Sequence, residues 1–354
     1  MVRLAANRNG YGTELVSLIV TPDSGIHGRV WLNPERSCVF DQVRIFGDRF
    51  HLRYEGRGAG VTPDVFHRQT LAFGKALTQD LSRLMVGVIG CGGTGSATAM
   101  LLARLGVGKL LLIDKDVVEV TNINRLHGAS LDNALKRDPK VDVVKKAIES
   151  IGLGNQVVGI QSWVDDIKCR DALKSCDIIF GCSDDNQGRL FLNRFAYYYL
   201  VPVFDMGLAI EIKNATLPYV QSLDGRVTVL YPGNACLLCR GVINLRMAMS
   251  EALRRSNPAE FERQKEEAYV LGEGEPNPAV VTFTTEVATM AVNEMLHRLQ
   301  GFRGVGGSTA QRTRLFHRMH DLRPGEQPSQ ECGVCGSSAV LGRGDVEPFL
   351  DRVD

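Results

Sequence analysis

Four glycines and one aspartate have the types and spacing of a nucleotide-binding turn. Gly90-Cys-Gly-Gly-Thr-Gly95 follows the apolar run Val86–Ile89, and Asp114 ends the next apolar run. One glycine permits the tight turn, one lets the backbone approach a phosphate, and one lets the following helix lie close to the strand. That helix directs its first N–H groups at the anion, and an acid placed like Asp114 binds ribose hydroxyls. Plain strand-to-helix connectors share this spacing, so a connector, an NAD site and an ATP site all remain open. The candidate phosphate-binding glycines are Gly90, Gly92, Gly93 and Gly95.

Cationic and amide side chains downstream favour a site in which the phosphates are attacked. The segment Thr121-Asn-Ile-Asn-Arg125 follows Asp114, and Lys140 comes shortly after it. Displacement of pyrophosphate needs cations because negative charge moves onto the leaving oxygens, whereas hydride transfer does not need such a clamp. Arg125 and Lys140 are therefore the candidates for that clamp.

Four of the nine cysteines form two CxxC pairs. These are Cys236-Leu-Leu-Cys239 and Cys332-Gly-Val-Cys335. Two residues between thiolates let both sulfurs face one metal, and four thiolates complete a closed tetrahedral zinc site. A single CxxC could be a redox pair, but two pairs favour structural zinc. We expect Cys236, Cys239, Cys332 and Cys335 to bind one Zn²⁺.

The chain resembles the ThiF, MoeB and HesA proteins, bacterial relatives of ubiquitin-activating enzymes. The resemblance extends from about Phe66 to Gly336 and rests on several motifs that keep their order and approximate spacing. Those motifs are Gly90–Gly95, Asp114, Thr121–Arg125, Pro139-Lys140, Cys182-Ser-Asp-Asp185 and the two CxxC pairs. The resemblance implies adenylation chemistry with ATP and Mg²⁺, and a structural role for the zinc.

Roles for single residues follow from the same resemblance. Gly92 and its neighbours would hold the α-phosphate and Asp114 the ribose, while Arg125 and Lys140 would neutralise the triphosphate that Asn122 orients. Asp184 matches a magnesium-binding aspartate; its usual neighbour is Asn, whereas here Asp185 follows, so either carboxylate could contact the ion. In Phe66-His-Arg68 the arginine matches a position that grips the terminal phosphates in a partner subunit, which implies a homodimer.

The implied reaction is attack of a C-terminal carboxylate on the α-phosphate of ATP, which gives an acyl adenylate and pyrophosphate. The expected acceptor is a small ubiquitin-like or sulfur-carrier protein. A peptide acceptor, as in MccB-like relatives, stays an alternative because of the N-terminal extension, and a tRNA nucleoside is a further one. In a different class, the chain would be an NAD-binding oxidoreductase or a scaffold without catalysis.

Five cysteines lie outside the CxxC pairs, and some relatives use such a thiol to take the activated acyl group. Residues 240–330 hold no cysteine, so we expect a mechanism that stops at the acyl adenylate. A buried apolar role is the more frequent fate of a lone cysteine, and the sequence leaves a thioester open at Cys38, Cys91, Cys169, Cys176 and Cys182.

Alternating apolar runs predict the elements that position these residues. Strands and helices alternate from 86 to 204, which predicts a Rossmann-like, mostly parallel sheet with helices on both faces. From about residue 215 the pattern changes to an antiparallel, β-rich half, with a hairpin turn expected at Asp224-Gly225. Thr285–Leu299 is expected to be a helix that packs in the core or in a dimer.

Domain boundaries follow from these patterns. Residues 1–65 are expected to form a small β-rich extension with strands at 15–21, 28–32 and 42–54. Substrate recognition and cover for an edge of the sheet are both open as its role. Residues 66–340 would form the adenylation domain, with a crossover segment at about 241–284 that holds a charged helical insertion, and residues 341–354 a tail.

Composition excludes several classes of protein. The 354 residues carry a net charge of +1, so no global charge favours nucleic acid or an anionic membrane. Six arginines and three histidines between 297 and 323 face a single acid, and we interpret them as a solvated rim. The N-terminus lacks a long apolar core and no apolar run reaches the ~20 residues of a membrane span. We expect a cytoplasmic protein.

Overall fold

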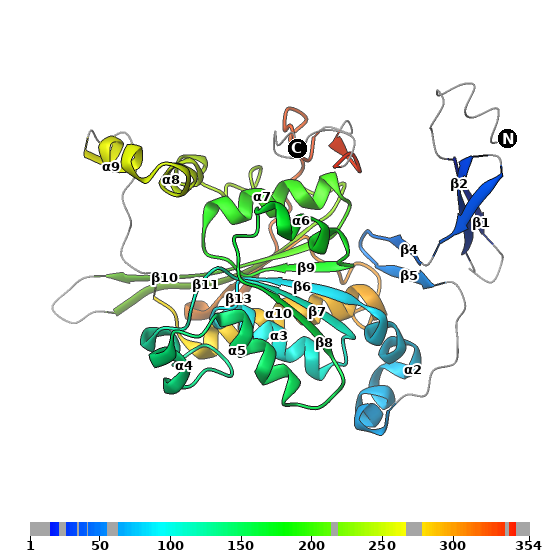
Figure 1. The fold of residues 1–354 in the computed structure, drawn as a ribbon, viewed down its shortest axis with the longest axis horizontal. Helices are drawn as coiled ribbons and strands as arrows, with labels where there is room; N and C mark the ends of the chain where they lie inside the picture. The colour runs from blue at the N-terminus through cyan, green and yellow to red at the C-terminus, as the bar shows by residue number, and fades with distance from the viewer. Residues whose placement is uncertain are drawn as a thin grey trace.

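The computed structural model describes residues 15–20, 26–33, 35–40, 42–54, 63–213, 219–266, 278–336 and 340–344. Its centre is an eight-stranded sheet in the order β13-β12-β11-β10-β9-β6-β7-β8 (Figure 1). The five strands from β10 to β8 are parallel, and β11, β12 and β13 are antiparallel. The expected Rossmann-like sheet with an antiparallel half is therefore confirmed. The strands are β6 (Met85–Ile89), β7 (Lys109–Ile113), β8 (Gln156–Ile160), β9 (Ile178–Gly181), β10 (Val203–Lys213), β11 (Tyr219–Leu230), β12 (Gln311–Leu315) and β13 (His320–Leu322).

Helices cover both faces of this sheet, and successive strand residues point to opposite faces. Val88 and Leu112 pack in the core on the face of α3 (Gly93–Arg104), α5 (Lys140–Glu149) and α10 (Val281–Gln300). Ile89 and Leu111 pack in a second core on the face of α6 (Ile167–Lys174) and α7 (Asn186–Tyr198). Figure 1 shows these two helical layers below and above the sheet. A sheet buried on both faces explains why its strands are continuous apolar runs.

The expected turn at Asp224-Gly225 is wrong, because both residues lie inside the continuous strand β11. Gly225 pairs with Leu208 of β10 and with Arg314 of β12. A Cβ at Gly225 would lie 2.6 Å from Val287 Cγ2 and 2.8 Å from Phe316 Cε2. The glycine is needed for the close approach of α10 to the strand and not for a reversal of the chain.

The N-terminal part forms two small antiparallel sheets. β1 (Leu15–Val20), β2 (Ile26–Asn33) and β3 (Arg36–Val39) form one, which stands apart from the main body in Figure 1. β4 (Gln42–Ile45) and β5 (His51–Tyr54) form the other, a hairpin within the stretch expected as a strand at 42–54. Phe50 and Leu52 of this hairpin are buried in the main core. The hairpin thus packs as part of the main body.

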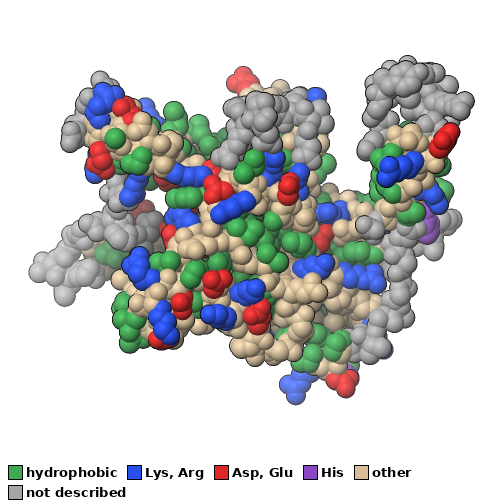
Figure 2. Space-filling model, in the orientation of Figure 1, with side chains coloured by type: hydrophobic (Ala, Val, Ile, Leu, Met, Phe, Trp, Pro, Cys, Tyr) green, Lys and Arg blue, Asp and Glu red, His purple; other side chains and the backbone are tan. Residues whose placement is uncertain are grey.

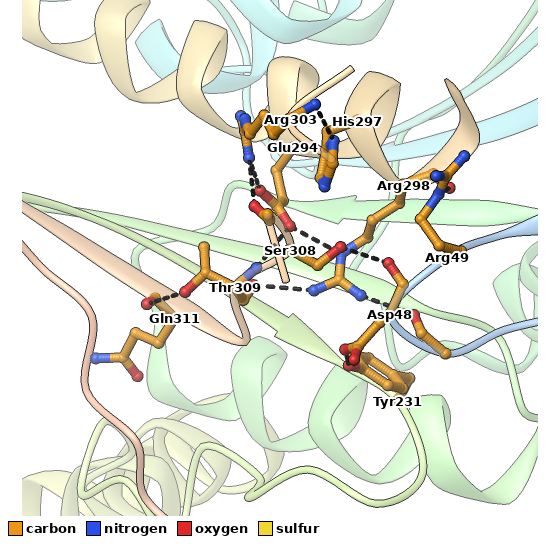
Figure 3. Close-up of polar contacts among 12 residues, drawn as sticks. Asp48, Arg49, Tyr231, Glu294, His297, Arg298, Arg303, Ser308, Thr309 and Gln311 are labelled. Carbon is orange, nitrogen blue, oxygen red and sulfur yellow. Dashed lines mark hydrogen bonds and ion pairs between the residues drawn. The ribbon is translucent and has the colours of Figure 1, made fainter. Parts of the chain in front are cut away.

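A buried polar network joins this hairpin to the end of α10 (Figure 3). The fully buried Arg298 guanidinium donates to the Gly47 carbonyl at 2.8 Å, to the Thr309 carbonyl at 2.9 Å and to Glu294 at 3.0 Å. Arg49 donates to the Arg298 carbonyl at 3.0 Å and so caps the C-terminus of α10. A buried arginine with all these partners is stable only while residues 47–49 are in place.

The basic stretch expected as a solvated rim is largely paired within the described residues. Arg312 and Arg314 both pair with Asp321, Arg303 pairs with Glu294, and Arg298 is buried. On the face shown in Figure 2, basic and acidic side chains are interspersed. Glu294 and Asp321 each offset part of the charge of two arginines of this stretch.

The remaining elements are helices around the main body. α2 (His67–Arg83) leads into β6 and is kinked at Gly74, which has a φ of 81°. α4 (Leu131–Lys136) follows the 3-10 turn η2 (Val120–Asn122). The charged insertion forms α8 (Leu245–Ser256) and α9 (Pro258–Glu266). Residues 267–277 of the expected crossover segment lie outside the described residues, and its end, 281–284, is the start of α10. The N-terminal residues 1–14 and the tail from 345 also lie outside the described residues. Among the helices described, none has the length and apolar character needed to cross a bilayer.

Candidate functional site

A cavity of about 230 Å³ opens at the carboxyl ends of the parallel strands, where ligands of such sheets bind. The loops after β6, β7, β8 and β9 contribute to it, together with residues 206–208 inside β10. The structure brings nearly all of the expected nucleotide-site residues to this one cavity. Its lining includes Gly90, Gly92, Gly93, Asp114, Asn122, Arg125, Lys140 and Asp184.

The glycines of the first loop have different roles. Gly90 has a φ of 88°, which other residues rarely adopt. A Cβ at Gly95 would lie 1.7 Å from the Gly90 carbonyl oxygen, so α3 can start this close to β6 only with glycine there. Gly92, the N-cap of α3, has open space where a Cβ would be. That space and the free N–H groups at the helix start suit an anion.

Asp114 lies behind the glycine loop and orders it. Its carboxylate accepts the Cys91 N–H at 2.6 Å and the Asp116 N–H at 2.8 Å. Burial raises the pKa of Asp114, although the charge of Lys140 and these two N–H groups oppose the rise. Asp114 thus holds the loop after β6 against the end of β7.

Lys140 begins α5 and points its ammonium at three carboxylates. Its Nζ lies 3.0 Å from Asp116 Oδ2. Burial alone would lower the pKa of Lys140, but the charges of Asp114, Asp116 and Asp184 outweigh burial and raise it. In turn, Lys140 holds the pKa of Asp116 below its usual value against the effect of burial. The ammonium is therefore cationic at neutral pH and stands beside the phosphate loop.

Arg125 packs over the start of α3. A Cβ at Gly93 would lie 3.3 Å from Arg125 Cγ and Cδ. The guanidinium donates to the Thr121 carbonyl at 2.6 Å and to Asn124 at 3.2 Å. Asn122 closes the same turn because its Oδ1 accepts the Glu119 N–H at 3.1 Å. A guanidinium anchored on its own turn, with donors left over, is suited to bind phosphate oxygens.

The two acids after β9 have different environments. Asp185 is the N-cap of α7, where it accepts the Gly188 N–H, and burial raises its pKa. Asp184 is exposed on the cavity wall near the Lys140 ammonium. Exposed carboxylate oxygens beside a phosphate-sized space are the kind of ligand that Mg²⁺ takes together with phosphates. Of the two candidates, Asp184 is the better placed for a cation.

Several residues of the cavity wall were not among the predicted site residues. Trp163 and Asp165, which follow β8, are two of them. Arg189 of α7 continues the Asp184 motif along the helix, and it shares the buried Asp205 with Arg226. The rule that loops after parallel strands line the site would have indicated Trp163 and Asp165. The pair of arginines on Asp205 has no local sequence signal, because the three residues come from different elements.

Arg68 lies outside the cavity of its own chain. It is exposed on α2, next to Gln69, whose side chain donates to the Leu105 carbonyl at 3.1 Å. Leu105 ends α3, whereas the phosphate loop is at the start of that helix. Arg68 therefore lies at the opposite end of α3 from the phosphate loop.

The two CxxC pairs meet as one four-cysteine cluster, although they are far apart in the sequence. All four sulfurs lie within 4.8 Å of one another. Cys236 Sγ lies 3.7 Å from Cys332 Sγ, and Cys239 Sγ lies 3.5 Å from Cys335 Sγ. A tetrahedral zinc with Zn–S bonds of about 2.3 Å needs sulfurs about 3.8 Å apart. The cluster could therefore hold a zinc ion, and the buried side chain of Asn193 supports it from behind through Cys236 and the Leu237 N–H.

Among the other cysteines, Cys91, Cys169 and Cys176 are buried, and burial raises the pKa of each thiol. Cys182 lines the cavity, but burial of its sulfur raises its pKa as well. Cys38 is exposed on β3. A nucleophilic cysteine needs a lowered pKa. The pKa of each of these four buried thiols is raised instead, so none of them meets that requirement.

Fold and site together define a nucleotide-binding α/β domain with an added four-cysteine cluster that could hold zinc. The model of the ThiF family matches residues 66–334, which is most of the chain, and the chain belongs to this family. Curated relatives agree. The chain is 43% identical over 98 residues to the tRNA threonylcarbamoyladenosine dehydratase of Bacillus subtilis, covering 28% of this chain and 38% of the relative. It is 33% identical over 129 residues to the molybdopterin-synthase adenylyltransferase of Haemophilus influenzae, covering 36% of this chain and 51% of the relative.

The chain spans about half the length, or less, of these curated relatives. Solved structures give a longer match at lower identity. The match to the crystal structure of E. coli MccB with ATP covers 77% of this chain and 75% of the MccB chain, with a TM-score of 0.57 and 18% sequence identity. This match supports the fold and extends beyond the segments shared with the curated relatives.

Proposed function

We propose that the chain adenylates the C-terminal carboxylate of a small ubiquitin-like or sulfur-carrier protein with ATP and Mg²⁺. One observation carries this proposal: the open N-terminus of α3, Arg125, Lys140 and Asp184 converge on one cavity. Relatives named as adenylyltransferases of molybdopterin synthase and of the sulfur carrier ThiS support it.

The side chains have complementary tasks in this reaction. The carboxylate oxygen of the acceptor attacks the α-phosphorus, and the bond to the bridging oxygen breaks, so that pyrophosphate leaves. The acceptor needs no general base because a terminal carboxyl is ionised at neutral pH. Lys140 and Arg125 neutralise charge on the leaving oxygens, and the α3 N-terminus holds the phosphate under attack. Asp184 would hold the Mg²⁺, which supplies further charge neutralisation and makes the phosphorus more electrophilic.

Three further assignments belong to the same proposal. The four-cysteine cluster would hold a structural zinc, and residues 66–340 would be the adenylation unit. The active form would be a homodimer in which Arg68 completes the partner's site. Support for the last point is the position of Arg68, which is exposed at the far end of α3.

The test is exchange of labelled pyrophosphate into ATP by the purified chain with Mg²⁺ and an acceptor. Exchange with a carrier protein that ends in Gly-Gly supports the proposal, and Lys140→Ala is the inactive control. Absence of exchange with every carrier and peptide, from protein that contains zinc and is folded, would sink it.

A peptide acceptor is the second candidate. The three-stranded sheet β1–β3 favours it, since apolar Val16, Leu18 and Val20 of β1 are largely exposed. Exposed apolar strands are suited to bind an extended peptide. Exchange that depends on a peptide and is lost when residues 1–41 are removed would favour this acceptor over a carrier protein.

A further inference from the structure

The loop after β8 forms the wall of the cavity beyond the position expected for ribose. Ser162 begins it, and its N–H donates to the Asp114 carbonyl at 3.2 Å. In a sheet of this kind the base extends from the ribose toward the next loop along the sheet. Trp163, which follows, is the one aromatic residue of the cavity lining in the described part of the chain. Ser162–Asp165 is thus the wall that a nucleotide base would meet.

Two cations hold the indole of Trp163. The Lys115 ammonium lies 4.2 Å from the ring centroid, and the Arg255 guanidinium carbon lies 5.0 Å from it. Lys115 belongs to the cavity wall, but Arg255 comes from α8, in the inserted segment. Cation–π contacts of this kind orient the ring. The orientation of Trp163 therefore depends on a helix outside the cavity.

Arg255 also contacts two acidic residues of the same loop. Its guanidinium pairs with Asp165 and lies 2.7 Å from Asp166 Oδ1. Asp165 is only 6% exposed, and its other oxygen accepts the Gln187 side chain at 2.9 Å. A planar guanidinium can satisfy two carboxylates at once. A single side chain thus fixes both the indole and the acids of the base-side wall.

A second residue of α8 contacts the start of α7, next to this loop. Glu251, one turn before Arg255, accepts the Gln187 N–H at 2.8 Å and the Asn186 side chain at 3.3 Å. Asn186 is the first residue of α7, directly after Asp184-Asp185. α8 is therefore attached both to the loop beside the base and to the helix start beside the metal-binding acid.

We propose that Arg255 is a positioning residue of the nucleotide site, which couples binding of ATP to the placement of α8 and α9. This inference rests on the proposed function, because it needs a nucleotide in the cavity. Arg255 touches neither phosphate loop nor reacting groups; it acts through Trp163, Asp165 and Asp166. Since coupling is reciprocal, a nucleotide that orders this wall also holds the inserted segment in place.

The experiment uses the full chain with Trp31→Phe, so that Trp163 is the remaining one of the two tryptophans and reports nucleotide binding by fluorescence. Arg255→Ala should weaken ATP–Mg²⁺ binding roughly tenfold, the loss expected when a charged hydrogen-bonding partner is removed. The kcat for pyrophosphate exchange at saturating ATP should stay within about twofold, because no contact to the reacting atoms is lost. Arg255→Lys should restore part of the affinity, and Arg246→Ala, an exposed arginine on the same helix, should change nothing.

Placement of α8 and α9 is measured by limited digestion with a glutamate-specific protease, whose sites the substitution leaves intact. ATP–Mg²⁺ should slow cleavage at Glu251, Glu260 and Glu262 in the parent chain and in Arg246→Ala, but not in Arg255→Ala. Should Arg255→Ala fail to fold by circular dichroism, the same measurements on Arg255→Lys decide.

Two outcomes overturn the inference. Unchanged ATP affinity in the Arg255 variants, or equal protection of α8 and α9 by ATP in all variants, would overturn it while leaving the adenylation reaction intact. Lack of ATP binding by the parent chain would instead overturn the proposed function, and this inference with it.

Discussion

The ammonium of Lys140 lies 3.0 Å from the Oδ2 of Asp116, so this cation is held by a carboxylate of its own chain before any phosphate is bound. The contact keeps a long, flexible side chain in one rotamer at the edge of the phosphate loop. A pre-positioned cation needs little reorganisation when charge develops in a transition state.

Replacement of Lys140 should therefore affect chemistry more than binding. For Lys140→Ala we expect pyrophosphate exchange to fall on the order of 10²-fold, with a smaller loss of AMP affinity. Lys145→Ala, on the same helix and paired with Glu149, is the matched control. Equal activity of the two variants would remove Lys140 from the mechanism.

A substitution at Gly92 should affect phosphate binding without affecting stability. Since a Cβ there meets no atom of the chain within 4 Å, Gly92→Ala should leave the free energy of unfolding within about 0.5 kcal/mol of the parent value. The new methyl group should nevertheless occupy the space of a phosphate and abolish ATP binding, which calorimetry would measure. Gly95→Ala, whose Cβ would clash with Gly90, should instead lower the Tm. Tight ATP binding by Gly92→Ala would show that the phosphate lies elsewhere.

Asp184 and Asp185 should respond in opposite ways to substitution by asparagine. Asp184→Asn should abolish most pyrophosphate exchange at unchanged Tm, because an exposed metal ligand is lost. Asp185→Asn keeps a residue that can cap α7, so its activity should stay close to that of the parent; Asp185→Ala should lose about 1 kcal/mol of stability. Titration of exchange against Mg²⁺ concentration checks the assignment, and a changed Mg²⁺ requirement in Asp185→Asn alone would reverse it.

Zinc bound to the four-cysteine cluster should stabilise the fold. Metal analysis of the purified chain should find one zinc per chain, and removal by a strong chelator should lower the Tm, since metal binding is linked to folding. Cys332→Ser should reduce both zinc content and Tm, whereas Cys38→Ser, at an exposed site on β3, should change neither. A chain that is equally stable with and without zinc would contradict a structural metal.

Arg68 can be tested by mixing two inactive variants. If Arg68 serves the partner's site, Arg68→Ala and Lys140→Ala chains combined one to one should recover about a quarter of the parent's active sites, because a mixed dimer holds one intact site. Each variant alone stays inactive. No recovery after subunit exchange, verified by native mass spectrometry, would assign Arg68 a role within its own chain.

Sequence patterns predicted the parts of the site in which chemistry requires fixed residue types at fixed spacing. The glycine loop, Asp114 and the CxxC pairs are of this kind: the loop and Asp114 line one cavity, and the two CxxC pairs form one cluster. The turn at Asp224-Gly225 was wrong because Gly225 serves a contact with Val287, a residue of a distant helix. The pair of Arg255 with Asp165 was missed for the same reason, since 90 residues separate the partners. Long-range contacts of this sort leave no periodic signal.

The contact between the Arg298 guanidinium and the Gly47 carbonyl bears on how such proteins can be recombined. Because Phe50 and Leu52 are buried in the main core, a chain cut at residue 65 would lose part of that core along with the three-stranded sheet. The three-stranded sheet ends at Val39, before the hairpin of β4 and β5. A joint near residue 41 would let the three-stranded sheet be exchanged for another while the main body keeps the hairpin that completes its core.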